Sequence, residues 1–224
     1  MKIGLVMTNY MYRSFLPWSC RSLQAQTRKP DYAIFLDDAS MDDSVEIVKK
    51  HFADLFDDII VNEKNLGMVA STNKGINLLI EKGCEYVCVL SSDDIFHSDY
   101  LLKTEKALSK AKKDVAYAYT WVRRIGLENQ VDAHPEWNKE ILMKAPYVHG
   151  SALVKAEAWG TVGGLPNAPK EEDWLFYKNL AELGWKGILV PEPLLIWRKH
   201  NQFCRTQYSD NNGRVLAWEK QKKG

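Results

Sequence analysis

Residues 89–94, Val-Leu-Ser-Ser-Asp-Asp, decide the fold, because an apolar run ends there in two adjacent carboxylates. The residues just before them, 86–90, are Tyr-Val-Cys-Val-Leu and lack the alternation of a half-exposed strand. This pattern predicts a strand buried on both faces, as in a parallel sheet. Ligands of open parallel sheets collect at the carboxyl ends of the strands, where Asp93 and Asp94 fall. The alternative is a solvated turn that caps the next helix.

A second apolar run, residues 32–36, also ends in two carboxylates, Asp37 and Asp38. Two parallel strands therefore bring acidic groups to the same edge of the predicted sheet. A carboxylate there accepts the imide N–H of uracil or thymine or the hydroxyls of a ribose, and a second one holds a cation that anchors a diphosphate. Helix capping is the competing interpretation for this pair.

Strand-like and helix-like segments alternate through the first 122 residues. Apolar runs predict strands at 2–7, 32–36, 59–61, 86–90 and 115–122. Helical spacing of apolar residues predicts helices at 15–26, 45–52, 69–80 and 100–111. This order predicts an α/β fold with a mostly parallel central sheet and helices on both faces.

The pattern is looser after residue 125. Prolines, tryptophans and charged residues in 126–146 predict an irregular or mobile segment, which is a candidate acceptor loop. A strand is expected at 149–154, followed by helices near 157–161 and 173–183. Two prolines interrupt the run 190–197, so we expect an edge strand there at most.

Length and composition favour one soluble domain. The 224 residues are 46% apolar and carry a formal net charge of +1, which gives no general attraction to nucleic acid or anionic membranes. No apolar run approaches a membrane span, and residues 3–7 are too short for a signal-peptide core, so we expect a cytoplasmic protein without an integral membrane segment. The four cysteines have no metal-ligand spacing and are expected to be reduced, mostly buried thiols: Cys20, Cys84, Cys88 and Cys204.

Several ordered motifs resemble the family 2 glycosyltransferases, which have the GT-A fold. Residues 22–27 match the S-x-x-x-Q-T that ends the family's first helix, and 37–42 match its D-D-x-S-x-D. An N-x-G turn at 65–67 and acids after the fourth strand follow in the family's order. The resemblance covers about residues 3–200. It implies a Rossmann-like GT-A domain at 1–203, with a nucleotide-sugar half (1–122), an acceptor and catalytic half (123–203) and a C-terminal tail (204–224).

The resemblance also implies a donor site with a divalent metal, Mn²⁺ or Mg²⁺. Matching positions assign nucleotide binding to Asn9, Tyr10, Asp38, Asn73, Ser92 and Asp93, and metal binding to Asp94 and His200. The sequence departs from the family at Ser91, where the first Asp of D-x-D is usual. A serine hydroxyl still hydrogen-bonds a ribose but carries no charge toward a cation.

Residues 170–174, Lys-Glu-Glu-Asp-Trp, match the family's acidic motif before an aromatic residue. The resemblance implies that Asp173 is the catalytic base of an inverting single displacement, with Glu172 as second choice. One carboxylate is enough for this reaction, because it takes the proton of the attacking hydroxyl while the metal neutralises the leaving diphosphate. Acids at a helix N-terminus also complement the helix dipole, which is the structural alternative.

Four further residues are assigned to the donor or acceptor sugar: His149, Gly150, Trp174 and Arg198. His149 and Gly150 match the family's segment beneath the sugars, and Arg198 belongs to the R-x-H that ends in His200. One or two aromatic residues, near Trp137 or Trp174, are candidates for stacking on a sugar ring.

These residues predict a metal-dependent inverting glycosyltransferase that moves a sugar from a nucleotide diphosphate donor, most simply a UDP-sugar, to an acceptor hydroxyl. The acceptor is expected on a glycan, a lipid-linked saccharide or a protein. A hydroxylated DNA base is disfavoured by the near-neutral charge. Nucleotidyl transfer is disfavoured because residues 3–13 contain no glycine-rich phosphate loop. A non-catalytic nucleotide-sugar-binding module remains an alternative because of Ser91.

Overall fold

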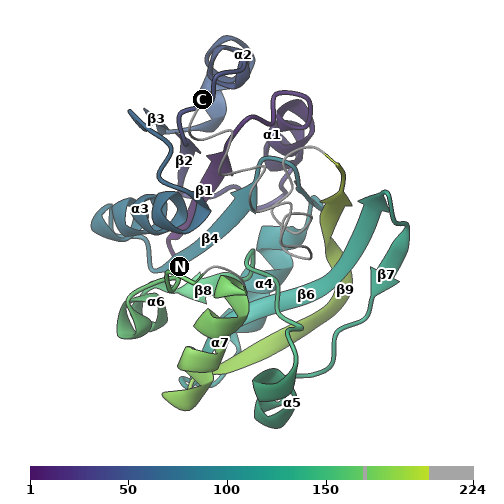
Figure 1. The fold of residues 1–224 in the computed structure, drawn as a ribbon. Helices are drawn as coiled ribbons and strands as arrows, with labels where there is room; N and C mark the ends of the chain where they lie inside the picture. Colours follow the sequence, from purple (N-terminus) through teal and green to yellow (C-terminus); the bar gives the residue numbers. More distant parts are fainter. Residues whose placement is uncertain (169–170, 202–224) are drawn as a thin grey trace.

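The computed structural model describes residues 1–168 and 171–201 of the protein. Strands and helices alternate along the chain much as the sequence predicts (Figure 1). The strands are β1 (Ile3–Asn9), β2 (Tyr32–Asp37), β3 (Asp58–Val61), β4 (Tyr86–Ser91), β5 (Ile95–Phe96), β6 (Val115–Gly126), β7 (Gln130–Asp132), β8 (Leu153–Lys155) and β9 (Lys186–Lys199). The helices are α1 (Leu16–Gln24), α2 (Ser44–His51), η1 (Ala53–Leu55), α3 (Met68–Glu81), α4 (Tyr100–Ser109), α5 (Lys139–Lys144), α6 (Ala156–Val162) and α7 (Glu172–Glu182).

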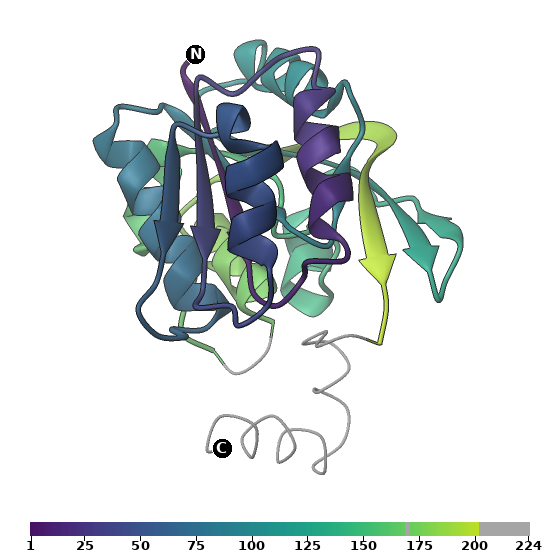
Figure 2. The same cartoon turned by 90° about the horizontal axis from the view of Figure 1, so that it is seen from above.

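All of the described strands belong to one mixed sheet with the order β3-β2-β1-β4-β8-β6-β9-β5, and β7 pairs with the outer part of β6. Strands β1 to β4 are parallel, and β6 is parallel to β9. Strand β8 is antiparallel to both β4 and β6, so β6 and β9 run in the same direction as β1 to β4. Figure 2 shows the arrowheads of β2, β3 and β9 at the same edge. The predicted α/β class with a mostly parallel sheet is confirmed.

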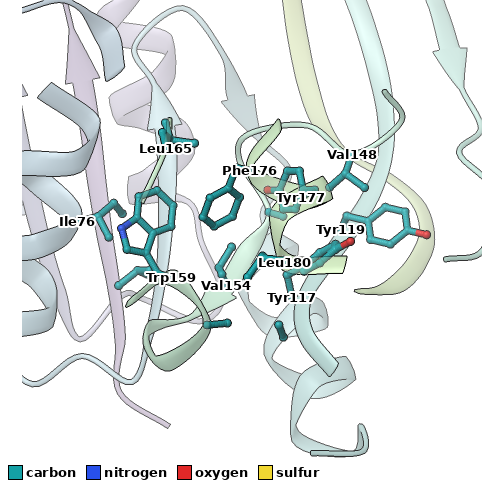
Figure 3. Packing of buried hydrophobic residues seen from close by; sticks show 14 of the residues in the cluster. Ile76, Tyr117, Tyr119, Val148, Val154, Trp159, Leu165, Phe176, Tyr177 and Leu180 are labelled. Carbon is teal, nitrogen blue, oxygen red and sulfur yellow. The ribbon is translucent and has the colours of Figure 1, made fainter. Parts of the chain in front are cut away.

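Helices cover both faces of the sheet, as predicted. On one face α1, α2 and α4 bury residues such as Leu16, Val48 and Leu101. On the other face α3, α6 and α7 form an aromatic-rich core, in which Trp159 lies between Ile76 and Phe176 (Figure 3). The Trp159 and Phe176 ring centroids are 4.7 Å apart. Each face of the sheet therefore has its own apolar core, which explains why β1, β2 and β4 are apolar on both sides.

The C-terminal strand is longer and more continuous than predicted. Strand β9 spans 14 residues and pairs with β6 along one side. On its other side, within the described chain, β5 pairs with Leu195 and Ile196, so β9 is an edge strand over most of its length, as expected. Its pairing with β6 shifts register where Thr120 faces Val190, Trp121 faces Pro193 and Val122 faces Leu195. The prolines lie at this irregularity, where a missing N–H costs no regular ladder bond. The register shift at the two prolines thus lets the strand continue where the sequence predicted an interruption.

The segment 126–146 is also more ordered than the sequence predicted, since it contains β7 and α5. Alternate aromatic residues of β6 form hydrogen bonds to this segment through their ring O–H or N–H groups. Tyr119 Oη donates to Pro135 O at 2.7 Å, and Trp121 Nε1 donates to His134 O at 3.0 Å. Trp137 Nε1 donates to Tyr117 Oη at 2.9 Å. These bonds hold the expected acceptor loop against the sheet, where the half-buried Trp137 packs against the core.

Three smaller expectations have clear outcomes. The strand expected at 149–154 is shorter, because only β8 pairs, and 149–152 is a turn. The expected division at residue 122 falls inside β6, so the two halves share one sheet, and the tail 204–224 lies outside the described residues. Cys20, Cys84 and Cys88 are free and buried, as expected, whereas Cys204 is not described. No helix of the described chain has the length and apolar character needed to cross a membrane.

Helix α3 approaches β1 so closely that a glycine is required at their contact. A Cβ added to Gly75 would lie 2.5 Å from Val6 Cγ2. By contrast, a Cβ at Gly160 in α6 would meet nothing within 4 Å. We expect Gly75→Ala to lower the free energy of unfolding by about 1–3 kcal/mol through overpacking. Gly160→Ala should raise it by about 0.5–1 kcal/mol through helix propensity.

Urea denaturation of the two variants tests this contact. Equal effects of the two substitutions would contradict the assigned packing of α3 on β1.

Candidate active site

The carboxyl ends of β1, β2 and β4 are joined by one side chain, Asn9. Its Nδ2 donates to Asp37 Oδ2 at 2.7 Å and to Ser40 Oγ at 3.2 Å. Its Oδ1 accepts from Ser92 Oγ at 2.6 Å. Asp37 and Ser92 have no exposed surface, and Asn9 is only 3% exposed. Asn9 and Ser92, predicted to bind the nucleotide, therefore build the floor that holds the two acidic strand ends together.

Asp38 lies beside this floor and is also buried. Its Oδ1 accepts from Asn62 Nδ2 at 2.9 Å and Leu66 N at 2.8 Å, and its Oδ2 accepts from Gly67 N at 2.8 Å. The predicted N-x-G turn at 65–67 thus donates two backbone hydrogen bonds to the Asp38 carboxylate. Since a carboxylate has about four acceptor positions, the described chain leaves one of them on Oδ2.

The Tyr10 phenol is half-buried near these acids. Burial, and then the charges of Asp38 and Asp37, raise the pKa of Tyr10. Tyr10 and Asp38 are therefore neighbours, as their joint prediction requires.

The two carboxylates at the end of β4, Asp93 and Asp94, have different surroundings. Asp94 is fully enclosed, and its Oδ1 accepts from Arg198 N at 3.0 Å. Burial, followed by the charge of Asp93, raises the pKa of Asp94 well above its usual range. Asp93 keeps 9% exposure, and His200 Nε2 lies 3.2 Å from its Oδ2. The structure therefore brings His200 to Asp93, whereas the sequence paired His200 with Asp94.

Asp93 and His200 fit a divalent ion, but as a minimal site. Among the described residues no three His, Cys, Asp or Glu side chains gather closely enough to hold an ion by themselves. Mg²⁺ and related ions are commonly held by one or two protein ligands, with phosphate and water oxygens completing the set. The Asp93 carboxylate matches that arrangement, and the His200 imidazole would be a less typical second ligand for such an ion.

Aromatic side chains from the loop before α1 support His200. The His200 ring centroid is 4.4 Å from that of Phe15 and 5.3 Å from that of Tyr12. The Arg198 guanidinium lies 5.1 Å from the Phe15 centroid, and its Nε donates to Asp93 O at 3.1 Å. The end of β9 is thereby tied to the ends of β1 and β4, and Arg198 lies at the acid pair.

The predicted base lies on α7 and meets the turn before β8. Asp173 is half-buried, and its Oδ2 accepts from Gly150 N at 3.1 Å. A Cβ at Gly150 would lie 2.7 Å from that oxygen, so only glycine lets the carboxylate approach the backbone this closely. The structure thus joins Asp173 with Gly150, while Glu172 is buried beside them.

His149 lies next to this contact and packs edge-on against Trp197, with ring centroids 5.4 Å apart. Its Nδ1 accepts from Ser151 N at 3.4 Å. Burial lowers the pKa of His149 to about 4. His149 is therefore a neutral side chain at physiological pH.

Two predicted residues make contacts with other parts of the protein, and their assigned roles stay predictions. The Asn73 carboxamide bonds the Leu165 backbone twice, donating to its O at 2.9 Å and accepting from its N at 2.8 Å. Asn73 therefore joins α3 to the turn after α6. Trp174 Nε1 donates to Leu142 O at 2.5 Å. The Lys178 ammonium lies over the Trp174 ring, 4.6 Å from the ring centroid. Trp174 thus packs α7 against α5.

The sequence alone did not reveal several supporting residues. Ser19 Oγ donates to Ser92 O at 2.8 Å or Asp94 O at 2.5 Å, which fixes the backbone of the acidic turn. Asn62 orients Asp38, and Lys74 Nζ donates to Asn62 Oδ1 at 2.7 Å. Such residues carry no motif signal, because their role depends on contacts between distant parts of the chain.

Comparison with known proteins agrees with this fold. The family model for glycosyl transferase family 2 matches residues 5–157. This chain belongs to glycosyl transferase family 2, which confirms the predicted family. Chondroitin synthase of Escherichia coli is 28% identical over 155 residues, which cover 66% of this chain and 22% of that protein. An uncharacterized glycosyltransferase of Methanocaldococcus jannaschii, MJ1057, is 27% identical over 89% of this chain and 71% of its own length.

Solved structures share the fold at low sequence identity. TarS 1–349 of S. aureus, in complex with UDP-GlcNAc, superposes with a TM-score of 0.76 at 16% identity, over 92% of this chain and 61% of that one. The mannosyltransferase PcManGT of Pyrobaculum calidifontis, in complex with GDP-Man and Mn²⁺, gives a TM-score of 0.71 at 16% identity, over 92% and 59%. The predicted GT-A fold is confirmed. This chain spans about a fifth of the chondroitin synthase and about three-fifths of the TarS chain.

The Asn9 junction leads to a stability prediction. Asn9→Ala leaves buried Asp37 with fewer donors and Ser92 without its acceptor, so we expect a loss of about 2–4 kcal/mol in the free energy of unfolding. Asn129 is exposed and accepts from the exposed Arg123, so Asn129→Ala should change stability by less than about 0.5 kcal/mol. Chemical denaturation measures both, and a small loss for Asn9→Ala would show that the junction is dispensable.

His149 leads to a pH prediction. Its folded pKa of about 4 lies below the usual 6.5, so the folded state binds fewer protons than the unfolded state between these values. Stability should therefore be intact above pH 6.5 and fall by about 1–3 kcal/mol as the pH drops to 4. His149→Gln should remove this part of the pH dependence, whereas His51→Gln, at an exposed site, should not. Urea denaturation midpoints measured between pH 4 and 6.5 test this prediction. If the midpoints of wild type and His149→Gln fell equally with pH, the burial of this imidazole would be contradicted.

Proposed function

We propose that this protein is an inverting glycosyltransferase that moves a sugar from a UDP-sugar to an acceptor hydroxyl, with Asp173 as the base and a divalent metal at the donor diphosphate. The observation that carries the proposal is the half-buried Asp173 carboxylate, held against the Gly150 amide in the first turn of α7. A carboxylate fixed in this way suits a general base, because its direction is set before the substrate arrives.

In the proposed reaction the acceptor hydroxyl gives its proton to Asp173 while its oxygen attacks the anomeric carbon. The bond from that carbon to the diphosphate breaks on the opposite face, which inverts the configuration. A bound Mg²⁺ or Mn²⁺ would neutralise the negative charge that the leaving diphosphate develops. Asp93 and His200 would hold the ion, and the Arg198 guanidinium next to them would face the diphosphate.

The donor nucleotide is inferred from the hydrogen bonds of Asp38. Three donors already occupy this carboxylate, and the one acceptor position left by the described chain suits a single N–H. Uracil presents one imide N–H, guanine presents two parallel N–H groups, and cytosine presents an acceptor at that place. This favours a UDP-sugar, and the TarS complex with UDP-GlcNAc supports the same choice.

The acceptor is proposed at the level of a class, a hydroxyl of a glycan, a lipid-linked saccharide or a protein. The relative named chondroitin synthase supports a saccharide acceptor. A non-catalytic nucleotide-sugar-binding module is the second candidate, because Ser91 replaces a usual acid at the donor site.

The base assignment predicts that Asp173→Asn lowers turnover of a UDP-sugar at least about 100-fold, because an amide cannot take the proton. Binding of UDP should stay within about twofold, since the nucleotide contacts lie on other elements. Glu171→Gln is the matched control, because Glu171 is an exposed carboxylate of the same acidic stretch and the substitution makes the same carboxylate-to-amide change. UDP release measures turnover. Retained turnover in Asp173→Asn would exclude it as the base.

The donor and metal assignments predict a specific pattern of thermal stabilisation. Manganese with UDP should raise the Tm, because a ligand at 100 times its Kd stabilises the folded state by about 2.7 kcal/mol. Manganese with GDP or CDP should raise it less. Asp93→Asn should remove the manganese-dependent part of the shift. Metal-dependent release of sugar from one UDP-sugar supports the enzyme, and binding without release across a donor panel supports the binding module.

A further inference from the structure

One peptide group, between His149 and Gly150, is held at both ends by α7. Its N–H, from Gly150, donates to Asp173 Oδ2 at 3.1 Å. Its carbonyl, from His149, accepts from Tyr177 Oη at 3.1 Å. The base of the proposed reaction and a buried tyrosine hydroxyl therefore bind the same peptide from opposite sides.

The spacing of these two side chains explains how one helix makes both contacts. Asp173 and Tyr177 are four residues apart and so lie on the same face of α7. None of the described peptide bonds is cis, so the N–H and C=O of this group point in opposite directions. The peptide consequently lies along the helix face, with its donor toward the carboxylate and its acceptor toward the phenol.

The surroundings also set the direction of the tyrosine hydroxyl. Tyr177 is 1% exposed, and its Oη donates to the His149 carbonyl at 3.1 Å. The O–H is therefore directed toward the His149 carbonyl. Loss of this donor would leave that carbonyl with the Ala152 N–H at 3.2 Å as its remaining described partner.

Peptide orientation matters because Gly150 is a glycine. Glycine adopts positive and negative φ angles about equally well. The peptide group that precedes a glycine therefore turns over more easily than one that precedes another residue. A turned peptide would point the His149 carbonyl at the Asp173 carboxylate, and two negatively polarised oxygens repel. The observed orientation instead offers the carboxylate a donor.

We propose that Tyr177 is a positioning residue, which acts on the base Asp173 by fixing the orientation of the 149–150 peptide. The inference rests on the proposed function, because it takes Asp173 as the base. Tyr177 touches neither sugar nor metal in this scheme. Its hydroxyl holds the peptide, and the peptide N–H in turn aims the carboxylate.

The same turn contains a matched control. Tyr100 Oη donates to the Ser151 carbonyl at 2.6 Å, and Tyr100 is also 1% exposed. Tyr100→Phe and Tyr177→Phe thus make the same chemical change, at equal burial, at the same turn 149–152. Of these two tyrosines, Tyr177 is the one whose hydroxyl binds the peptide group that contacts Asp173.

The test compares wild type, Tyr177→Phe and Tyr100→Phe by two readouts. The first is hydrogen exchange of the Gly150 amide, followed by NMR, which reports the bond to Asp173 without any substrate. The second is kcat and KM for hydrolysis of the UDP-sugar that the donor panel identifies, measured by UDP release with manganese. We expect Tyr177→Phe to lower Gly150 protection and kcat each by about 10-fold, with KM within about twofold. Tyr100→Phe should stay within about twofold of wild type in all three quantities.

Each outcome decides the inference. Wild-type protection or wild-type kcat in Tyr177→Phe would overturn it, as would equal losses in Tyr100→Phe, which would indicate a general structural effect. If Tyr177→Phe does not fold, Gly150→Ala tests the contact from the other side, because its Cβ would displace Asp173 Oδ2, and unchanged kcat there would also overturn it. Failure of the proposed function appears differently, as wild-type turnover that does not depend on Asp173.

Discussion

Carboxylates buried at the ends of parallel strands must be matched by donors, and most of the candidate site is built to meet this requirement. Asp37, Asp38 and Asp94 have almost no exposed surface. Asn9 supplies one donor to Asp37, the turn at 65–67 supplies two to Asp38, and Arg198 N supplies one to Asp94. Because an unpaired buried charge is very costly, these bonds fix the relative positions of the strand ends. These strand ends are thus held together by hydrogen bonds within the chain itself.

The acidic strand ends divide into two roles according to exposure. Asp37 and Asp94 are used within the protein, whereas Asp93 keeps some exposure and a nearby imidazole. In the pair Asp93 and Asp94, one carboxylate is therefore enclosed and bonded to the backbone of β9, while the other keeps some exposure beside His200. Strand β9 completes the arrangement, since its end returns Arg198 and His200 to the β4 edge more than 100 residues later in the chain.

Much of the fold follows from local sequence. Apolar runs and helical spacing located β1 to β4 and α1 to α4 to within a few residues, because both faces of the sheet are buried and the pattern is therefore strong. The ordered motifs indicated the family for the same reason, since they occupy strand ends and turns that have fixed backbone demands. The weakest predictions were β9 and the segment 126–146. Their order comes from a bulge opposite β6 and from the ring tips of Tyr117, Tyr119 and Trp121, which no local pattern reveals.

The sequence by itself determined the α/β class, the family and the residue types at the carboxyl edge, because strand periodicity and motif spacing are properties of neighbouring residues. Only the tertiary structure decided how those residues are used. It placed His200 against Asp93, tied Asn73 to Leu165 and set Asp173 and Tyr177 on the two ends of one peptide group. These contacts join residues from 23 to 107 positions apart. Their geometry depends on how helices pack on the sheet, which a linear sequence pattern does not contain.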